Sequence, residues 1–183
     1  YFAKNSKGYS PEWIQCIKGS IGDIAPNFTM KRMIDDYIDR FYNKEAARTA
    51  RLEANEYALA KEIVAWKEKV AAAWDGIEVF DIITEDSGNN TVTGQPYSVK
   101  IIVDTNGLGK DLAIENVIYK SENGEDKLYN KVDFEVVKEE GNVLTYELKS
   151  NLTDAGVFRC AYRMYPKNAE LPHRQDFAFT RWI

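Results

Sequence analysis

Side chains that could carry out acid–base or nucleophilic catalysis are sparse in this sequence. His173 is the single histidine among 183 residues, so a catalytic triad or a Cys–His pair could be assembled only around it. It lies within residues 171–174 (Leu-Pro-His-Arg), an expected loop, where a lone histidine is more often solvated than catalytic. One histidine and two distant cysteines cannot supply the four ligands of a zinc site. We therefore predict no catalytic and no metal-binding residue.

The acidic pairs and the glycine-rich turn also lack the spacing that catalysis or phosphate binding requires. Asp35 and Asp36 are neighbours in a predicted helix, where adjacent side chains point in different directions. Glu139 and Glu140 stand at a predicted turn and are typical of a solvated loop. Residues 107–110 (Gly-Leu-Gly-Lys) lack the first glycine and the closing Ser or Thr of a phosphate-binding loop. We accordingly predict no cofactor-binding residue in this chain.

Aromatic side chains, 13% of the residues, offer binding rather than catalytic chemistry. Their rings combine an apolar face with a polar edge, which suits the stacking of sugars. Trp13, Trp66 and Trp74 fall on the apolar stripes of predicted helices, where we expect them to be packed in a core. The C-terminal region is the part that remains open to a ligand. Three residues there are candidate sugar contacts: Tyr165, His173 and Trp182.

The overall composition excludes several partner classes. The net charge is −5 and no segment is rich in Lys or Arg, which argues against nucleic acid. No apolar run approaches the roughly 20 residues that a membrane span needs, and no signal peptide opens the chain. Cys16 and Cys160 are far apart in sequence, and we expect reduced, buried thiols rather than a disulfide. We predict a cytoplasmic protein without nucleic-acid or membrane partners.

Helical spacing dominates residues 1–76. The first residue, Tyr1, is not a methionine, which suggests a segment of a longer polypeptide. Ser10 and Thr29 are expected helix N-caps, and apolar residues recur at i, i+3 and i+4 after each of them. Residues 44–75 contain no Gly or Pro, with Asn55 as a candidate break. The apolar side of the first two helices is a candidate docking face, represented by Trp13, Met33, Tyr37 and Phe41.

Residues 77–183 alternate between apolar and polar types, as half-buried strands do. The candidate strands are residues 77–79, 97–103, 114–119, 128–137, 144–148, 157–165 and 177–182. About seven short strands separated by turn residues are typical of an antiparallel sandwich. Residues 154–160 resemble the start of strand F in immunoglobulin-type domains, with Phe158 in place of the usual tyrosine two residues before Cys160. We predict an α+β fold: an N-terminal helical segment (1–76) followed by an antiparallel immunoglobulin-like β-sandwich (77–183).

The strand predicted at residues 157–165 has the clearest alternation. Arg159 and Arg163 share one face and are expected to meet solvent. We expect the other face to point into the core, and it carries Phe158, Cys160, Tyr162 and Met164.

Two stretches carry a resemblance to a known family. The first comprises Glu12-Trp13-Ile14, residues 18–21 (Lys-Gly-Ser-Ile) and residues 24–37 (Ile-Ala-Pro-Asn-Phe-Thr-Met-Lys-Arg-Met-Ile-Asp-Asp-Tyr). It resembles the closing helices of bacterial α-glucan phosphorylases. The second comprises residues 163–168 (Arg-Met-Tyr-Pro-Lys-Asn), 171–174 and 181–183 (Arg-Trp-Ile). It resembles the segment that ends the longer members of the same branch. The motifs are short, and their joint occurrence in the right order carries the resemblance.

The resemblance implies a parent enzyme with two Rossmann-like lobes. Such an enzyme uses pyridoxal phosphate to attack the ends of α-1,4 glucan with inorganic phosphate and releases glucose 1-phosphate. Its cofactor lysine belongs to a Gly-Thr-Ser-containing motif that this sequence lacks, so the resemblance assigns no catalytic or cofactor residue here. It implies that residues 1–76 end the catalytic region and that residues 77–183 form an accessory domain.

Three hypotheses follow for the role of this chain. The first is structural docking, with the catalytic lobes of the same chain as the partner. The second is a glucan-binding accessory module that uses Tyr165, His173 and Trp182. The third is an oligomerisation surface. Docking requires an exposed apolar stripe on the first two helices, whereas sugar binding requires exposed aromatic rings on one face or in a groove.

Overall fold

The computed structural model describes residues 3–85, 96–122, 124–151 and 154–183. The chain divides into two compact units, Tyr1–Lys61 and Glu62–Ile183. The first unit is helical. The second contains the end of one helix and all the described strands.

The helices of the first unit begin at side-chain caps. In α1 (Pro11–Gly19), the backbone N–H of Trp13 donates to the hydroxyl oxygen of Ser10 at 3.4 Å. In α2 (Met30–Tyr37), the N–H of Arg32 donates to the hydroxyl oxygen of Thr29 at 3.2 Å. Both caps agree with the sequence prediction, because each satisfies an amide that the first turn leaves without a helical partner. A π-helical turn follows each helix, at Ser20–Ile24 and at Ile38–Tyr42.

The long helix α3 (Asn43–Ala73) is interrupted near its middle. Ala54 is extended, and the next three residues have positive φ angles of 51°, 55° and 64°. Asn55 opens this left-handed stretch, and asparagine adopts that conformation more readily than most residues. The predicted break at Asn55 is confirmed.

A tight junction connects α3 to the strands. The turn Trp74–Gly76 follows the helix, and the side-chain Nδ2 of Asn106 donates to the carbonyl of Ala73 at 2.9 Å. This bond satisfies one of the carbonyls that a helix end leaves without a partner. A Cβ atom on Gly76 would lie only 2.4 Å from the same Nδ2. A residue with a side chain at position 76 would therefore clash with Asn106.

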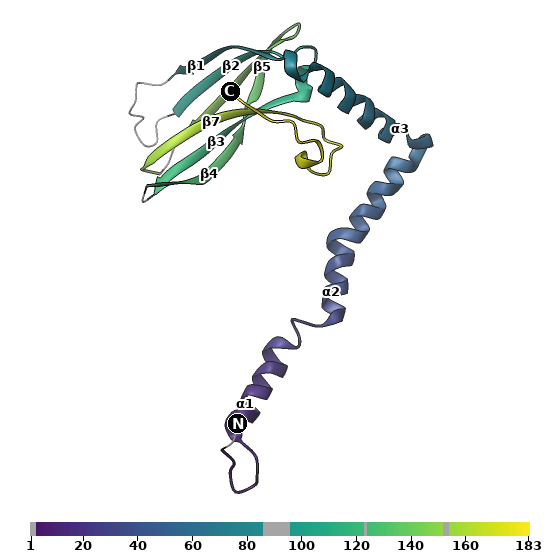
Figure 1. The fold of residues 1–183 in the computed structure, drawn as a ribbon, viewed down its shortest axis with the longest axis vertical. Coiled ribbons are helices and arrows are strands. Elements are labelled where there is room, and N and C mark those ends of the chain that lie inside the picture. The colour runs from purple at the N-terminus through teal and green to yellow at the C-terminus, as the bar shows by residue number, and fades with distance from the viewer. Residues whose placement is uncertain (1–2, 86–95, 123, 152–153) are drawn as a thin grey trace. The chain divides into compact units, whose positions relative to one another are not determined.

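The strands form two four-stranded antiparallel sheets (Figure 1). The first has the order β1-β2-β6-β5 and the second the order β4-β3-β7-β8. The prediction of a helical segment followed by antiparallel sheets is confirmed. The strands span β1 (Glu78–Glu85), β2 (Pro96–Asp104), β3 (Leu112–Glu122), β4 (Glu125–Asp133), β5 (Glu135–Glu140), β6 (Val143–Asn151), β7 (Val157–Pro166) and β8 (Arg181–Trp182).

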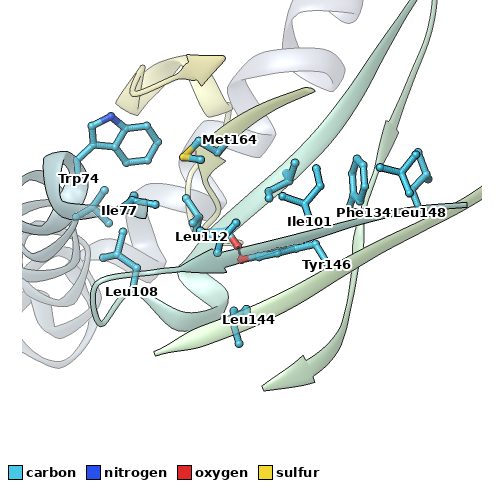
Figure 2. Packing of buried hydrophobic residues seen from close by; sticks show 14 residues of the cluster. Trp74, Ile77, Ile101, Leu108, Leu112, Phe134, Leu144, Tyr146, Leu148 and Met164 are labelled. Atoms are coloured by element: carbon cyan, nitrogen blue, oxygen red, sulfur yellow. Dashed lines mark hydrogen bonds between the residues drawn. The ribbon is translucent and has the colours of Figure 1, made fainter. Parts of the chain in front are cut away.

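The two sheets share one hydrophobic core. Hydrogen bonds between described residues link the two sheets: the hydroxyl of Tyr146 donates to the carbonyl of Leu112 at 2.7 Å, and Asn116 Nδ2 donates to the Tyr97 hydroxyl at 3.3 Å. Trp74 extends the core toward the end of α3 (Figure 2). The buried cluster comprises Val70, Trp74, Ile77, Val99, Ile101, Val103, Leu108, Leu112, Ile114, Phe134, Leu144, Tyr146, Leu148 and Met164.

Two predicted strands differ from the observed ones. The single strand predicted at residues 128–137 is two strands, β4 and β5, which lie in different sheets. The chain passes from one sheet to the other at Phe134. Its N–H donates to the carbonyl of Ile114 at 2.9 Å, and its ring contacts Tyr162. The strand predicted at residues 177–182 is reduced to β8, and a 3-10 turn, Arg174–Phe177, precedes it.

The predicted inward face of β7 is correct at one end only. Met164 is fully buried and Tyr162 packs against the core, but Phe158 is half-buried and Cys160 is exposed. Phe158 pairs with Lys120, in the part of β3 that becomes exposed, whereas Cys160 pairs with Ile118, which is buried. The expectation of buried thiols is wrong, because Cys16 and Cys160 are both exposed.

Candidate functional site

The candidate docking residues lie on an exposed face of the helical unit. Trp13, Tyr37 and Phe41 are 47%, 44% and 54% exposed, and Met33 is half-buried. The expectation that Trp13 lies in a core is wrong, since α1 has no buried residue. Trp66 and Trp74, the other two tryptophans on helical stripes, are half-buried and buried.

Exposed apolar side chains occur along both helices, in the π-helical turns and in the connection between them. Within described residues 3–61, no apolar side chain is buried. Tyr37 contacts the rings of Phe41 and Tyr42, with centroid distances of 6.0 and 6.4 Å. The large exposed members are Trp13, Ile17, Ile21, Ile24, Phe28, Met30, Ile34, Tyr37, Ile38, Phe41 and Tyr42.

Charged pairs accompany this face on α2. Lys31 Nζ lies 2.5 Å from a carboxylate oxygen of Asp35, and Arg32 Nη1 lies 2.6 Å from one of Asp36. Both pairs have the i, i+4 spacing that brings two side chains together on one side of a helix. The helix is therefore amphipathic, with a solvated charged side and an uncovered apolar side.

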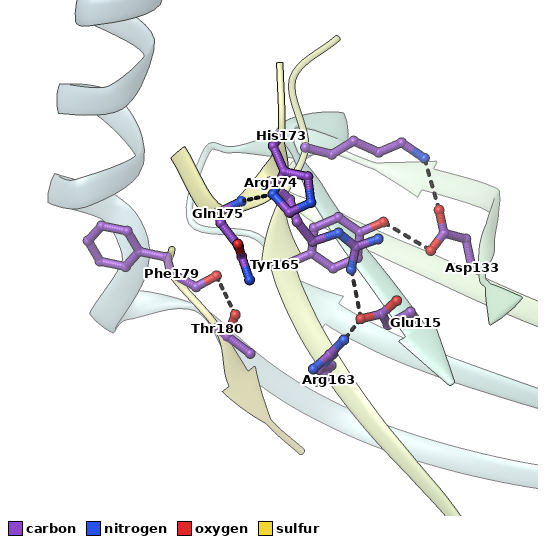
Figure 3. A network of polar contacts seen from close by, with 10 residues as sticks. Glu115, Asp133, Arg163, Tyr165, His173, Arg174, Gln175, Phe179 and Thr180 are labelled. Carbon is purple, nitrogen blue, oxygen red and sulfur yellow. Dashed lines mark hydrogen bonds and ion pairs between the residues drawn. The ribbon is translucent and has the colours of Figure 1, made fainter. Parts of the chain in front are cut away.

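A buried carboxylate organises the second candidate site, in the strand unit. Glu115 in β3 is 1% exposed and is the direct cross-strand partner of Arg163 in β7. Its Oε1 atom accepts from Arg163 Nε and, at 2.8 Å, from Nη1 of Arg174 (Figure 3). Two guanidinium groups thus converge on one oxygen, which compensates the buried charge of the carboxylate.

Aromatic rings hold the two arginines in place. The guanidinium of Arg174 lies 4.1 Å from the ring centroid of Tyr165, and that of Arg163 lies 5.2 Å from the ring centroid of Trp182. The Tyr165 hydroxyl donates to a carboxylate oxygen of Asp133 at 2.9 Å. Burial, followed by the neighbouring Asp133 carboxylate, raises the pKa of Tyr165. Tyr165 is therefore a neutral donor whose ring supports a cation.

The segment that follows β7 completes this site. Residues 174–180 are anchored by Phe177 against Trp66 and by Phe179 against Trp74, with ring centroids 5.4 and 5.3 Å apart. Together with β7 they enclose a hollow of about 500 Å³. Its lining comprises Lys131, Arg163, Tyr165, Pro166, His173, Arg174, Gln175, Phe177, Ala178, Phe179 and Thr180.

The structure brings two of the three candidate sugar contacts together in this hollow. Tyr165 and His173 line it, while Trp182 is 52% exposed and stacks on Arg163, which also lines it. Tyr165 is buried and Arg174 stacks on its ring, so the ring is not an open platform for a sugar. Nδ1 of His173 accepts from the N–H of Gln175 at 3.1 Å.

Sequence reasoning missed Glu115, Arg174 and Asp133 as members of this site. A signal for Glu115 exists, since a carboxylate occurs within an otherwise apolar and amide run, residues 112–119 (Leu-Ala-Ile-Glu-Asn-Val-Ile-Tyr). A charge in such a strand requires a buried partner. Arg174 has no comparable signal, because it reaches Glu115 from 59 positions away.

Among the residues that the structure describes, no group of three or more His, Cys, Asp or Glu side chains could hold a metal ion. None of the described helices is both long and apolar enough to cross a membrane.

Comparison with known proteins gives matches along most of the chain. A family model described as "Glycogen phosphorylase C-terminal domain" matches residues 74–183. The maltodextrin phosphorylase of Thermococcus litoralis is 33% identical over 178 residues, which cover 93% of this chain and 20% of that protein. The glycogen phosphorylase of Mycobacterium bovis is 21% identical over 175 residues, with the same coverage of 93% and 20%.

A shorter match concerns a third protein. The glycogen phosphorylase of Aquifex aeolicus is 41% identical over 44 residues, which cover 24% of this chain and 6% of that protein. The chain spans about one fifth of the length of the Thermococcus and Mycobacterium relatives.

Proposed function

This chain belongs to the family of glycogen phosphorylase C-terminal domains, and we propose that it serves as the non-catalytic docking end of an α-glucan phosphorylase. The parent enzyme is a cytoplasmic, pyridoxal-phosphate-dependent glycosyltransferase. It releases glucose 1-phosphate from α-1,4 glucan with inorganic phosphate. The names of the relatives, which are maltodextrin and glycogen phosphorylases, support this assignment.

The residues of this chain do not fit the cofactor. Pyridoxal phosphate is held through a Schiff base to a lysine in an enclosed site. Every lysine that the structure describes is exposed or half-buried, and Lys131, the lysine that lines the hollow, is exposed. We assign the cofactor site to the upstream polypeptide and derive no step through it.

The uncovered helical face carries the docking proposal. Burying a large apolar side chain stabilises a protein by about 1.5–3 kcal/mol. The helices of residues 3–61 receive little of this stabilisation, because their large apolar side chains remain exposed or half-buried. Helices as short as α1 and α2 are marginal without packing. A partner surface over this face supplies the missing stabilisation.

The partner we propose is the upstream part of the same polypeptide, which contains the catalytic lobes. The relatives are about five times as long as this chain, so most of their surface lies outside the matched region. Residues 1–76 are then the end of the catalytic region, and residues 77–183 are the accessory domain.

We also propose that the accessory domain is an immunoglobulin-like sandwich. The order β1-β2-β6-β5 corresponds to strands A, B, E and D of a constant-type immunoglobulin domain. The order β3-β7-β8 corresponds to strands C, F and G, with β4 added beside β3. The shared core of the two sheets supports the same assignment.

The docking role is tested by Tyr37→Asp in the full-length parent enzyme. A carboxylate at the centre of the apolar face should lower the melting temperature by several degrees and reduce phosphorolysis of maltodextrin, because a buried unpaired charge is costly. Lys31→Gln is the matched control: it makes the same change in net charge at a side chain that is 84% exposed. Unaltered melting and turnover in the Tyr37→Asp enzyme would refute docking. A change in subunit assembly without a change in the monomer's melting would favour an oligomerisation surface instead.

Glucan binding is a second candidate function, favoured by the exposed ring of Trp182 beside the hollow. It is tested by titrating the 183-residue chain with maltoheptaose while following tryptophan fluorescence, with Trp182→Ala as the variant. Saturable quenching that the variant lacks would support it. The covered ring of Tyr165 makes docking the better supported function.

A further inference from the structure

The hollow beside β7 is basic in an acidic chain. The chain has a net charge of −5, yet Lys131, Arg163 and Arg174 line the hollow and no acidic residue of the described chain does. Glu115, which lies beneath, compensates one of these three cations, and the nearby carboxylate of Asp133 is paired with Lys167, which lies outside the lining. Two positive charges therefore face the hollow uncompensated, which raises the local concentration of anions.

The two arginines are fixed before any ligand arrives. Arg163 and Arg174 both donate to Oε1 of Glu115, and the rings of Trp182 and Tyr165 support their flat faces. Surface arginines ordinarily lose rotamer freedom when they bind an anion. Here less rotamer freedom is lost on binding, because Glu115 and the two rings already order both side chains.

Donor groups remain for a ligand. Arg163 uses only Nε on Glu115, and Arg174 uses only Nη1, so the other guanidinium N–H groups have no hydrogen-bond acceptor within the described chain. Since Nδ1 of His173 accepts a hydrogen bond from Gln175, the proton of the neutral ring is on Nε2. The hollow thus offers guanidinium, ammonium and imidazole donors.

We propose that this hollow is a binding site for a dianionic phosphate group, either free or as a monoester. Phosphate and phosphate monoesters carry about −1.5 to −2 charges at neutral pH, which matches the two uncompensated cations. Guanidinium groups bind phosphate oxygens in pairs of parallel hydrogen bonds. The hollow of about 500 Å³ exceeds a phosphate group, and Phe177 and Phe179 in its lining leave an apolar wall for an organic substituent.

A neutral sugar chain fits the hollow less well. It would leave both positive charges without a partner while displacing their water, which is unfavourable. Sugars usually stack on an open aromatic face, and the guanidinium of Arg174 covers that of Tyr165. The inference is independent of the proposed docking function, because it concerns the strand unit alone.

The test uses the 183-residue chain, so that no upstream catalytic site contributes phosphate binding. Amide chemical shifts are followed by NMR during titration with inorganic phosphate and, separately, with glucose 6-phosphate. Sodium chloride at matched ionic strength and maltoheptaose are the comparison titrants. We expect saturable shifts at Gln175 and Thr180 with both phosphates. The tighter of the two identifies whether the free ion or the monoester is the ligand.

Two variants locate the binding. Lys131→Gln should weaken phosphate binding about threefold, because it removes one exposed charge. Arg174→Lys should weaken it about tenfold, because lysine keeps a charge for Glu115 but lacks the planar fork. Lys127→Gln, on the same strand and outside the lining, is the control and should bind like the parent chain.

Several outcomes would overturn the proposal. These are shifts that do not saturate, shifts reproduced by sodium chloride, and shifts caused by maltoheptaose but not by phosphate. Equal affinities in Lys131→Gln, Arg174→Lys and Lys127→Gln chains would also overturn it. Thermal melting of each variant verifies folding. Among the described residues the Lys131 side chain has no hydrogen-bond or ion-pair partner, so Lys131→Gln tests the site even if Arg174→Lys is destabilised.

Discussion

The hydroxyl of Tyr146 in β6 donates a 2.7 Å hydrogen bond to the carbonyl of Leu112 in β3 and so joins the two sheets through their core. Tyr146 is 1% exposed, and burial raises the pKa of its hydroxyl. The bond is therefore an internal tie between two antiparallel sheets that share no strand.

Tyr146→Phe should destabilise the chain by about 1–2 kcal/mol, because it removes this hydrogen bond at nearly constant volume. Urea denaturation followed by circular dichroism measures the change. Tyr119→Phe is the matched control, since the Tyr119 hydroxyl has no hydrogen-bond partner among the described residues and should be nearly neutral. Equal losses in the two variants would contradict a specific role for the tie.

Glu115→Gln should destabilise the chain by about 2–3 kcal/mol. The substitution removes the negative charge that both Arg163 and Arg174 bind. We expect a smaller loss of unfolding free energy than for breaking a fully buried ion pair, because Arg174 is partly exposed. Glu122→Gln is the control, since its ion pair with Lys127 is exposed and should contribute almost nothing. A Glu115→Gln chain as stable as the control would show that the network does not stabilise the fold.

The stability of the strand unit should fall at high pH. Burial raises the pKa of Tyr97, Tyr146 and Tyr165, and it raises that of Tyr162 to about 12. An unfolded tyrosine has a pKa of about 10. The stabilisation is therefore complete below about pH 10 and declines above it, because the unfolded chain then releases protons that the folded chain retains.

Urea unfolding at pH 8 and at pH 11 measures this decline. Tyr162→Phe should show a smaller difference between the two pH values than the parent chain does. A parent chain whose stability is constant or increases over this range would contradict the burial of these hydroxyls.

Phe158→Ala and Met164→Ala should differ strongly although both residues lie on one face of β7. Met164 is fully buried, and its truncation should cost about 2–5 kcal/mol. Phe158 is half-buried against Tyr129, so its truncation should cost clearly less, about 1–2 kcal/mol. Thermal or urea unfolding of both variants checks the order. A larger loss for Phe158→Ala would place the core at the opposite end of the strand.

Local features were predictable from the sequence and non-local ones were not. The caps at Ser10 and Thr29 and the break at Asn55 depend on residues within a few positions of each other. The alternation in β7 places Arg163 on the face opposite Met164, but Arg163, which was expected to meet solvent, is half-buried and binds Glu115. It does not indicate where along the strand the covering layer ends, which is why Phe158 and Cys160 were assigned to the core.

The remaining differences arise from contacts between distant segments. The chain passes from one sheet to the other at Phe134 with no glycine or proline beside it, and the N–H of Phe134 donates to the carbonyl of Ile114. The phosphate site requires Lys131, Arg163 and Arg174, which belong to three segments that only the sheet register and the anchored C-terminal turn bring together. Neither composition nor periodicity contains that information.

The junction at Gly76 has a consequence for the evolutionary record of this family. A Cβ atom at position 76 and the amide of Asn106 cannot occupy the same space, and Asn106 also caps the carbonyl of Ala73. Relatives that replace the glycine should therefore carry a smaller residue at position 106 and close the helix end in another way. We expect these two positions, 30 apart in the chain, to covary as a pair across an alignment of the family.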